Sequence, residues 1–321
     1  MIAVTGASGL LGRHLVDKLL EEGEQVIAVV RDGSARFPEG VLVRAADLMD
    51  SFALQEALKG VHAVVHCAAL VSFNPRRRSE IMRVNVEGTR NLVNICLQER
   101  IPNLIQISSV SALGRKPGVL IREEDPWTDQ YATDYATSKY LAELEVFRGA
   151  EEGLTVGLVN PSVILSGNPL HRSSGSLFDY VWRGRRFYTE GTFNYVDARD
   201  VSDAVYTLIR NPRPGERFIL SAGNISYFDF FSRLARHWQK RTPSIRIPHA
   251  LVTAFGFTEE IRCWLTGREP LVTRQSAAMT VRDFRYDNSK AMNILGVRYR
   301  TLDETVDWCC AQYAQHVSGN K

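Results

Sequence analysis

The first two thirds of the chain alternate between short apolar runs and longer segments in which apolar residues recur every three or four positions. Uninterrupted apolar runs are typical of buried parallel strands, and the wider spacing is typical of amphipathic helices. We expect strands at residues 2–4, 26–30, 41–45, 62–69 and 103–109, and a sixth ending at Pro161. Helices are expected between them, near residues 10–22, 52–59, 79–100 and 131–151. Strands that alternate with helices predict an α/β fold, a doubly wound parallel sheet covered on both faces.

The pattern changes after Pro161, where glycine, serine and arginine become frequent and the elements become shorter. Two helix starts remain legible there, Ser226 with Asp229 and Thr301 with Glu304, because each pair has the spacing of an N-terminal capping box. We therefore expect a nucleotide-binding domain over residues 1–162 and a smaller lobe, mainly substrate-binding, over residues 163–321. Segments around 192–220 are expected to return to the sheet of the first domain.

The chain opens directly into a glycine-rich turn, TGASGLLG at residues 5–12, between the first strand and the first helix. Its glycines are Gly6, Gly9 and Gly12, and Leu10 and Leu11 begin the helix. Such a turn lets backbone N–H groups approach a pyrophosphate at the positive end of the helix. Glycine turns without a ligand are common, but the strand before this one and the helix after it favour a Rossmann-type site for a nicotinamide dinucleotide.

A tyrosine and a lysine lie four residues apart, as Tyr135 and Lys139, within the helix expected at 131–151. They share one helical face, and a nearby ammonium group would lower the pKa of the phenol toward the neutral range. Ser109 ends the strand before this helix, where it could bond a substrate oxygen together with Tyr135. Ser108 and Ser111 are alternatives to it. The plainer interpretations are a surface helix on which the lysine covers the tyrosine, and a serine that serves a turn.

Arg31 follows the second strand, at the place where NAD-selective sites usually carry a carboxylate. A guanidinium there favours the 2′-phosphate of NADP(H), with possible help from Arg36. Asp32 could take its place, and Arg31 could be a solvated surface charge. We therefore expect NADP(H) to be preferred and NAD(H) to remain possible.

Composition and charge narrow the class of protein. A formal net charge of +3 over 321 residues gives no electrostatic case for nucleic acid. No segment reaches the roughly 18 to 20 apolar residues that a membrane span needs. The 5 cysteines are odd in number and show no metal-ligand spacing, which favours a reducing compartment and no metal site. We expect a cytoplasmic protein that acts on a small molecule.

Several motifs together, TGASGLLG, ISSVSALG, YATSK, VNPSVILSG and FNYVDARDV, resemble the extended short-chain dehydrogenase/reductase superfamily. The similarity covers essentially the whole chain and points to the branch with dihydroflavonol 4-reductase, 3β-hydroxysteroid dehydrogenase and the sugar-nucleotide epimerases. It implies that Ser109, Tyr135 and Lys139 are catalytic, that Lys139 also holds the nicotinamide ribose, and that Asn85 supports the site. It further implies cofactor contacts by Asp47, Leu48, Ala68, Pro161 and Val163. At positions 66 and 67 the chain has His66 and Cys67, where other members of the superfamily commonly have Asn and Ala.

The resemblance also separates the possible reactions. Sugar-nucleotide dehydratases of the superfamily usually carry an acidic residue just after the active-site serine or threonine, where this chain has Val110 and Ser111. Epimerases commonly retain NAD, against which Arg31 argues. An NADP(H)-dependent oxidoreductase acting on a carbonyl or alcohol group is therefore expected. The alternatives are an NAD-dependent sugar-nucleotide epimerase and a non-catalytic NADP(H)-binding protein. Relatives often pair through two long helices, so a homodimer is possible.

Overall fold

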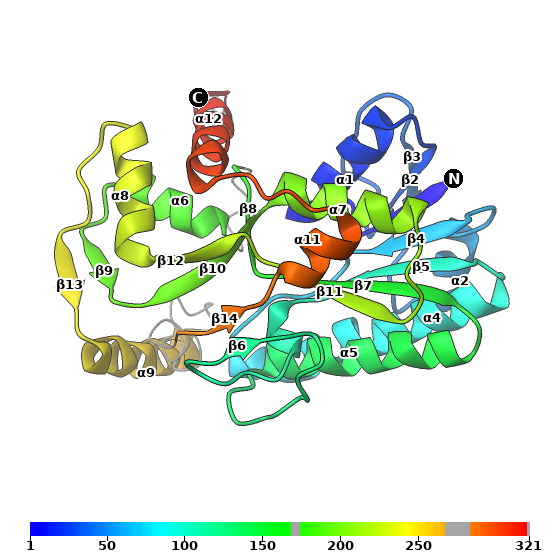
Figure 1. Ribbon diagram of the computed structural model, residues 1–321, viewed down its shortest axis with the longest axis horizontal. Coiled ribbons are helices and arrows are strands. Elements are labelled where there is room, and N and C mark those ends of the chain that lie inside the picture. The colour runs from blue at the N-terminus through cyan, green and yellow to red at the C-terminus, as the bar shows by residue number, and fades with distance from the viewer. Residues whose placement is uncertain (168–173, 267–282, 320–321) are drawn as a thin grey trace.

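The computed structural model describes residues 1–167, 174–266 and 283–319, and its centre is one large parallel sheet. In the described residues the sheet has 7 strands in the order β11-β7-β5-β4-β1-β2-β3. Their bounds are Ile2–Thr5 (β1), Val26–Val30 (β2), Leu42–Ala45 (β3), Ala63–His66 (β4), Asn103–Ile107 (β5), Thr155–Pro161 (β7) and Glu216–Leu220 (β11). The order runs outward from β1 in both directions, as in a Rossmann fold (Figure 1).

Helices cover both faces of this sheet. One face packs against α1 (Leu10–Glu21), α7 (Ala198–Arg210) and α11 (Ser289–Leu295), through side chains such as Leu15 and Leu208. The opposite face packs against α2 (Ser51–Ala57), α4 (Gly88–Gln98) and α5 (Asp134–Glu151), through Leu54, Leu92 and Val146 (Figure 1). The expected doubly wound sheet is confirmed, and β11 adds a strand to the six read from the sequence.

The helix expected at 79–100 is confirmed over residues 78–98, but it is not a regular α-helix throughout. The chain instead forms a 3₁₀ turn at Pro75–Arg77, α3 at Arg78–Met82, a π turn at Arg83–Glu87 and then α4. The π turn carries the buried side chain of Asn85 inward, where it bonds to other segments. Similarly, α5 begins at Asp134 after an N-cap by Thr133, whose hydroxyl accepts a bond from the N–H of Ala136 at 3.1 Å, so the preceding residues 131–133 lie outside the helix.

The smaller lobe is built around a three-stranded sheet, β12-β10-β8, whose strands are Gly223–Ser226, Thr192–Asp197 and Val163–Leu165. It also holds α6 (Gly175–Trp182), α8 (Tyr227–His237), α9 (His249–Thr266), α12 (Leu302–Gly319) and the pair β9 (Phe187–Thr189) with β13 (Ile245–Ile247) (Figure 1). Another short pair, β6 (Leu120–Ile121) with β14 (Arg285–Tyr286), packs through Ile121 in a small apolar cluster with Ile219 of β11. Of the segment around 192–220, β11 lies in the large sheet and α7 covers it, whereas β10 belongs to the small sheet.

Both helix starts expected in this lobe are confirmed. The Ser226 hydroxyl accepts a bond from the N–H of Asp229 at 3.0 Å, and the Glu304 carboxylate accepts one from the N–H of Thr301 at 2.8 Å. Residues 168–173 and 267–282, which belong to the lobe expected to be mainly substrate-binding, lie outside the described residues. No described helix is both long enough and apolar enough to cross a bilayer.

Candidate active site

The residues proposed from the sequence gather at one edge of the large sheet. Because its strands are parallel, their carboxyl ends meet there: the turns after β1, β4 and β5 carry Gly6, Ala68 and Ser109, and Pro161 ends β7. Val163 follows on β8 with 37% of its surface exposed. Ligands of open α/β sheets bind at this edge, so these residues lie where a ligand of such a fold would bind.

The glycine turn is so tight that glycines are needed at its first and last positions. Gly6 has φ of +65°, and a Cβ there would lie 2.7 Å from the Ala68 Cα. A Cβ on Gly12 would lie 2.3 Å from the carbonyl oxygen of Gly6. Gly9 precedes α1, and within the described chain no side chain caps that helix. The turn therefore presents free N–H groups of Leu10 and Leu11 to an anion, which fits the pyrophosphate of a dinucleotide.

The turns after β2 and β3 carry the residues expected near the adenosine. Arg31 is exposed directly after β2, while Asp32 is bound within its own loop, accepting from the N–H of Ser34 at 3.1 Å and from its hydroxyl at 2.9 Å. After β3, Asp47 is exposed and Leu48 is buried. A guanidinium rather than a carboxylate therefore stands at the end of β2.

A further arginine approaches this region from α1. Arg13 donates to the carbonyl oxygen of Arg36 at 3.2 Å, and its guanidinium lies 5.5 Å from the centre of the Phe37 ring. The sequence interpretation missed Arg13. Its position directly after Gly12 was the available signal, because a residue in the first turn of α1 must lie near the glycine turn.

Ser109, Tyr135 and Lys139 meet where β5 ends against α5. Lys139 is 4% exposed, and its Nζ donates to the carbonyl oxygen of Ile107 at 2.7 Å. Ser109 starts a 3₁₀ turn, and its hydroxyl accepts bonds from the N–H and hydroxyl of Ser111 at 3.1 and 3.0 Å. The Ser109 side chain also interacts with the Tyr135 phenol. The three side chains thus lie together, although Ser109 follows β5 and the other two residues belong to α5.

The acid strengths in this group differ from the sequence expectation in one respect. Burial raises the pKa of Tyr135 to about 12, and the Ser109 side chain opposes that rise only in part. Burial also lowers the pKa of Lys139 to about 8. The lowering of the Tyr135 pKa that was expected from Lys139 is therefore not found, because desolvation raises this pKa by more than the Ser109 side chain lowers it. Tyr135 holds its proton at neutral pH.

Asn85 links α5 to the loop after β4. Its side-chain oxygen accepts from the N–H of Leu70 at 2.7 Å, and its Nδ2 donates to the Leu70 carbonyl at 3.0 Å and to the Ser138 hydroxyl at 2.9 Å. Ser138 in turn donates to the carbonyl oxygen of Tyr135 at 2.8 Å. The supporting role expected of Asn85 therefore has a physical basis, since it braces the turn of α5 that carries the tyrosine.

A buried histidine, His66, joins the first strand to this brace. Its Nδ1 lies 2.6 Å from the Thr5 hydroxyl and its Nε2 lies 3.1 Å from the Thr89 hydroxyl. Thr89 donates to the Asn85 carbonyl at 2.6 Å, so its one proton is used and His66 must donate to it. Burial lowers the pKa of His66 to about 3, which keeps the ring neutral. The sequence interpretation noted His66 only as a residue that differs from the superfamily pattern, and it missed the contacts of His66 with Thr5 and Thr89.

An aromatic residue, Phe73, contacts Tyr135 and is followed by a run of arginines. Phe73 packs edge-on against the Tyr135 ring, 6.1 Å between ring centres, and is 38% exposed. In the following arginine run, Arg77 bonds Glu80 at 2.7 Å and Arg78 lies 3.6 Å from Asp134. These two arginines are thus already paired with carboxylates.

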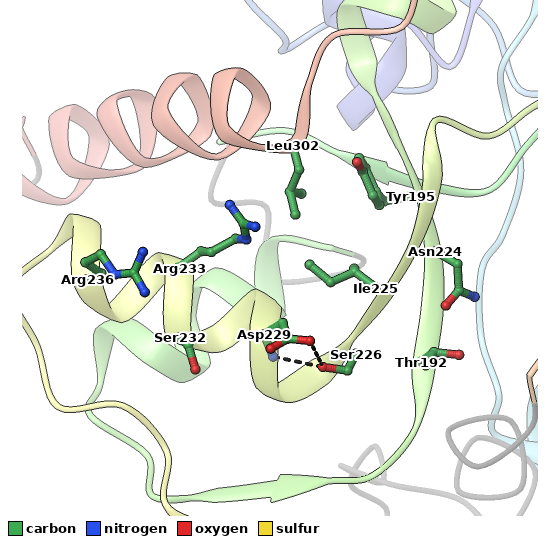
Figure 2. Close-up of a pocket in the computed structure, with 10 residues that line it drawn as sticks. All are labelled: Thr192, Tyr195, Asn224, Ile225, Ser226, Asp229, Ser232, Arg233, Arg236 and Leu302. Atoms are coloured by element: carbon green, nitrogen blue, oxygen red, sulfur yellow. Dashed lines mark hydrogen bonds between the residues drawn. The ribbon is translucent and has the colours of Figure 1, made fainter.

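A separate pocket of about 570 Å³ lies on the smaller lobe between α8, β10, β12 and the start of α12 (Figure 2). Its lining includes Tyr195, Asn224, Arg233 and Leu302 and contains none of the residues expected to act in catalysis or cofactor binding. Arg233 is paired with Asp303. The pocket is therefore distinct from the sheet-edge site.

The chain is similar to several known proteins over nearly its whole length. The chain is 29% identical over 304 residues to the sterol demethylase protein B of Methylococcus capsulatus, covering 92% of each chain. It is 29% identical over 317 residues to a putative dihydroflavonol 4-reductase of Synechocystis, covering 94% of this chain and 91% of the other. The crystal structure of gox2253 superposes with a TM-score of 0.85 at 29% identity, covering 98% of both chains.

The model of the NAD dependent epimerase/dehydratase family matches residues 2–221. This range includes the glycine turn, the Ser109, Tyr135 and Lys139 group and all seven strands of the large sheet. The chain belongs to the NAD dependent epimerase/dehydratase family, within the extended short-chain dehydrogenase/reductase superfamily.

Proposed function

We propose that this protein is an NADP(H)-dependent oxidoreductase that interconverts a carbonyl group and an alcohol on a small organic substrate. The observation that carries the proposal is the meeting of Ser109, Tyr135 and Lys139 at the sheet edge that also holds the glycine turn. The supporting relatives include a putative dihydroflavonol 4-reductase.

The proposed chemistry divides between the cofactor and the chain. A bound nicotinamide supplies the hydride in reduction and accepts it in oxidation. Tyr135 gives its proton to the carbonyl oxygen as the alkoxide forms, and Ser109 holds the same oxygen. Lys139 stabilises the phenolate that remains after the proton has left. With a pKa of about 12 the phenol arrives at the reaction protonated, but it is a weaker acid than an ordinary tyrosine.

The surroundings of Tyr135 favour reduction of a carbonyl over dehydration. A dehydratase needs a group that abstracts a carbon-bound proton near the catalytic serine, and the two residues after Ser109 are Val110 and Ser111. The Ser111 hydroxyl is engaged with Ser109 at 3.0 Å. The exposed Phe73 beside Tyr135 suits an apolar substrate surface. Arg31 at the end of β2 supports NADP(H) over NAD(H).

The test is NADPH consumption over a panel of aldehydes, ketones, flavanonols, steroids and sugar nucleotides. With any substrate that reacts, Tyr135→Phe should lower kcat at least about a hundredfold, because the proton donor is lost, while NADPH affinity stays near that of the native protein. Tyr140→Phe is the matched control, since Tyr140 lies on the same helix but stacks on Trp127 at 4.5 Å. Turnover retained in Tyr135→Phe would refute the role of the phenol. NADPH binding without turnover of any compound would favour a non-catalytic binding protein.

A further inference from the structure

A buried carboxylate, Glu143, lies one helical turn beyond Lys139 on α5 and is 1% exposed. Its two oxygens are held from two different strands. Asn160 on β7 donates to Oε1 at 2.6 Å, and Arg217 on β11 donates to Oε2 at 3.1 Å. A carboxylate is costly to bury: burial raises the pKa of Glu143, and the bonds from Asn160 and Arg217 oppose that rise. Glu143 therefore belongs to a built arrangement rather than to a chance contact.

Asn160 connects Glu143 to the backbone of Ser109 in the active site. Besides Glu143, its Nδ2 donates to the carbonyl oxygen of Ser109 at 3.0 Å. An amide group has two N–H donors, so both are used, one on the carboxylate and one on the serine backbone. Asn160 is fully buried and directly precedes Pro161. The carboxylate thus orients the amide that holds the end of β5.

The charge of Glu143 also acts on Lys139. The Lys139 ammonium group is buried against a neutral acceptor, the carbonyl oxygen of Ile107. Burial lowers the pKa of Lys139, and Glu143 is the carboxylate that opposes this effect in the described part of the protein. The other titratable groups facing Lys139 are Tyr135, one turn earlier on α5, which burial keeps protonated with a pKa of about 12, and two groups at the end of β4. Burial holds His66 neutral and raises the pKa of the Cys67 thiol to about 12, so neither carries charge at neutral pH.

We propose that Glu143 is a positioning residue of the active site, whose carboxylate holds the Ser109 backbone through Asn160 and keeps Lys139 in its ammonium form. Tyr135, Lys139 and Glu143 then act along one face of α5 at four-residue intervals. The inference rests on the proposed function for the roles of Ser109 and Lys139, but the electrostatic effect on Lys139 is independent of any substrate.

The direct test is the titration of Lys139 followed by NMR of ¹³C-labelled lysine, with Lys139→Met used to assign the signal. The native protein should titrate near pH 8. Glu143→Gln removes a negative charge that favours the ammonium form, so the midpoint should fall by about one unit. Glu143→Asp keeps the charge and should restore most of the difference. Glu145→Gln is the control, because Glu145 lies on the same helix but bonds Arg90 and Arg148 at the surface.

The second arm separates the two effects of Glu143. Asn160→Ala removes the bridge to Ser109 but leaves the carboxylate, so kcat should fall severalfold while the Lys139 midpoint stays within a few tenths of a unit. If Glu143→Gln does not fold, the double variant Glu143→Gln/Arg217→Gln removes both members of the buried pair and leaves no uncompensated charge. Its Lys139 midpoint should fall in the same direction.

The outcomes distinguish this inference from the proposed function. An unshifted Lys139 midpoint in folded Glu143→Gln, or in the double variant, would overturn the inference even if carbonyl reduction proceeds. A shifted midpoint in a protein that reduces none of the carbonyl compounds would sustain the electrostatic role and refute the proposed function instead. A midpoint shift of equal size in Glu145→Gln would show a general charge effect and would also overturn the inference.

Discussion

Arg31 and Asp32 are neighbours in sequence, yet the structure gives them different partners. Asp32 is occupied by the N–H and hydroxyl of Ser34, and these bonds lower the pKa of its carboxyl group. Arg31 is exposed beside it. A carboxylate at this point would accept bonds from ribose hydroxyls and repel a 2′-phosphate, whereas a guanidinium attracts the phosphate.

Replacing Arg31 by alanine should therefore weaken NADPH binding at least about tenfold and change NADH binding little, because only NADPH carries the 2′-phosphate. Calorimetric dissociation constants for both cofactors measure the difference. Arg185→Ala is a matched control, since Arg185 is exposed on the smaller lobe and its loss changes the net charge equally. Equal NADPH and NADH affinities in the native protein would contradict the proposed preference.

The pKa of Tyr135 could not be predicted from the sequence spacing alone. The four-residue separation from Lys139 correctly brings the two side chains to one face of α5. Spacing says nothing about how much water remains around the phenol. Burial is contributed by many segments at once, and here it raises the pKa more than its neighbours lower it.

Among the elements, the π turn between α3 and α4 has the clearest consequence for the site. An extra residue in one helical turn displaces the usual backbone bonds and re-aims the side chains around it. Here it brings Asn85 to Leu70 and Ser138, each within 3.0 Å. The apolar periodicity of residues 79–100 predicts helix throughout, because a single inserted residue leaves the spacing of the surrounding apolar positions almost unchanged.

Asn85→Ala should lower the free energy of unfolding by about 1 to 3 kcal/mol, because it leaves part-buried backbone groups of Leu70 and the buried Ser138 hydroxyl without their bonds to Asn85. It should also lower kcat more than it lowers NADPH affinity, since Ser138 then loses a bond that braces Tyr135. Urea denaturation and steady-state kinetics measure the two effects. Asn94→Ala, an exposed site on α4, is the control. A variant as stable and active as the control would show that the brace is unnecessary.

At the scale of the whole molecule, the two lobes are joined by polar contacts near α7. Asp200 on α7 is 1% exposed and accepts from the backbone N–H of Arg300 at 3.0 Å and from its guanidinium. Arg300 also reaches Asp203 at 3.3 Å, and it stands just before α12. On the other side of this junction, His14 of α1 lies 2.8 Å from the Ser166 hydroxyl after β8.

Arg300→Ala should lower the free energy of unfolding by about 2 kcal/mol, because it leaves the Asp200 charge buried with only a backbone donor. Chemical denaturation measures the loss. Arg298→Ala removes an exposed charge two residues away and should cost little. Equal losses in the two variants would mean that net charge, rather than the buried pair, accounts for the effect.

The sequence by itself determined the features of this protein that depend on local spacing. These are the alternation of strands and helices, the glycine turn that opens α1, and the Tyr135 and Lys139 pair on one helical face. Each follows from the geometry of a strand, a tight turn or a helix, which a few neighbouring residues suffice to specify. The sequence also predicted that Ser109 lies near Tyr135 and Lys139, because it follows a strand at the carboxyl edge of the parallel sheet.

Only the tertiary structure decided which distant groups share a buried space. Glu143 meets Arg217, 74 residues away, and Asn160 meets the Ser109 carbonyl, 51 residues away. No periodicity records such meetings, because they arise when strands and helices pack and exclude water together. The same exclusion of water sets the proton affinities of Tyr135 and Lys139, so the chemical state of the site belongs to the folded molecule rather than to its motifs.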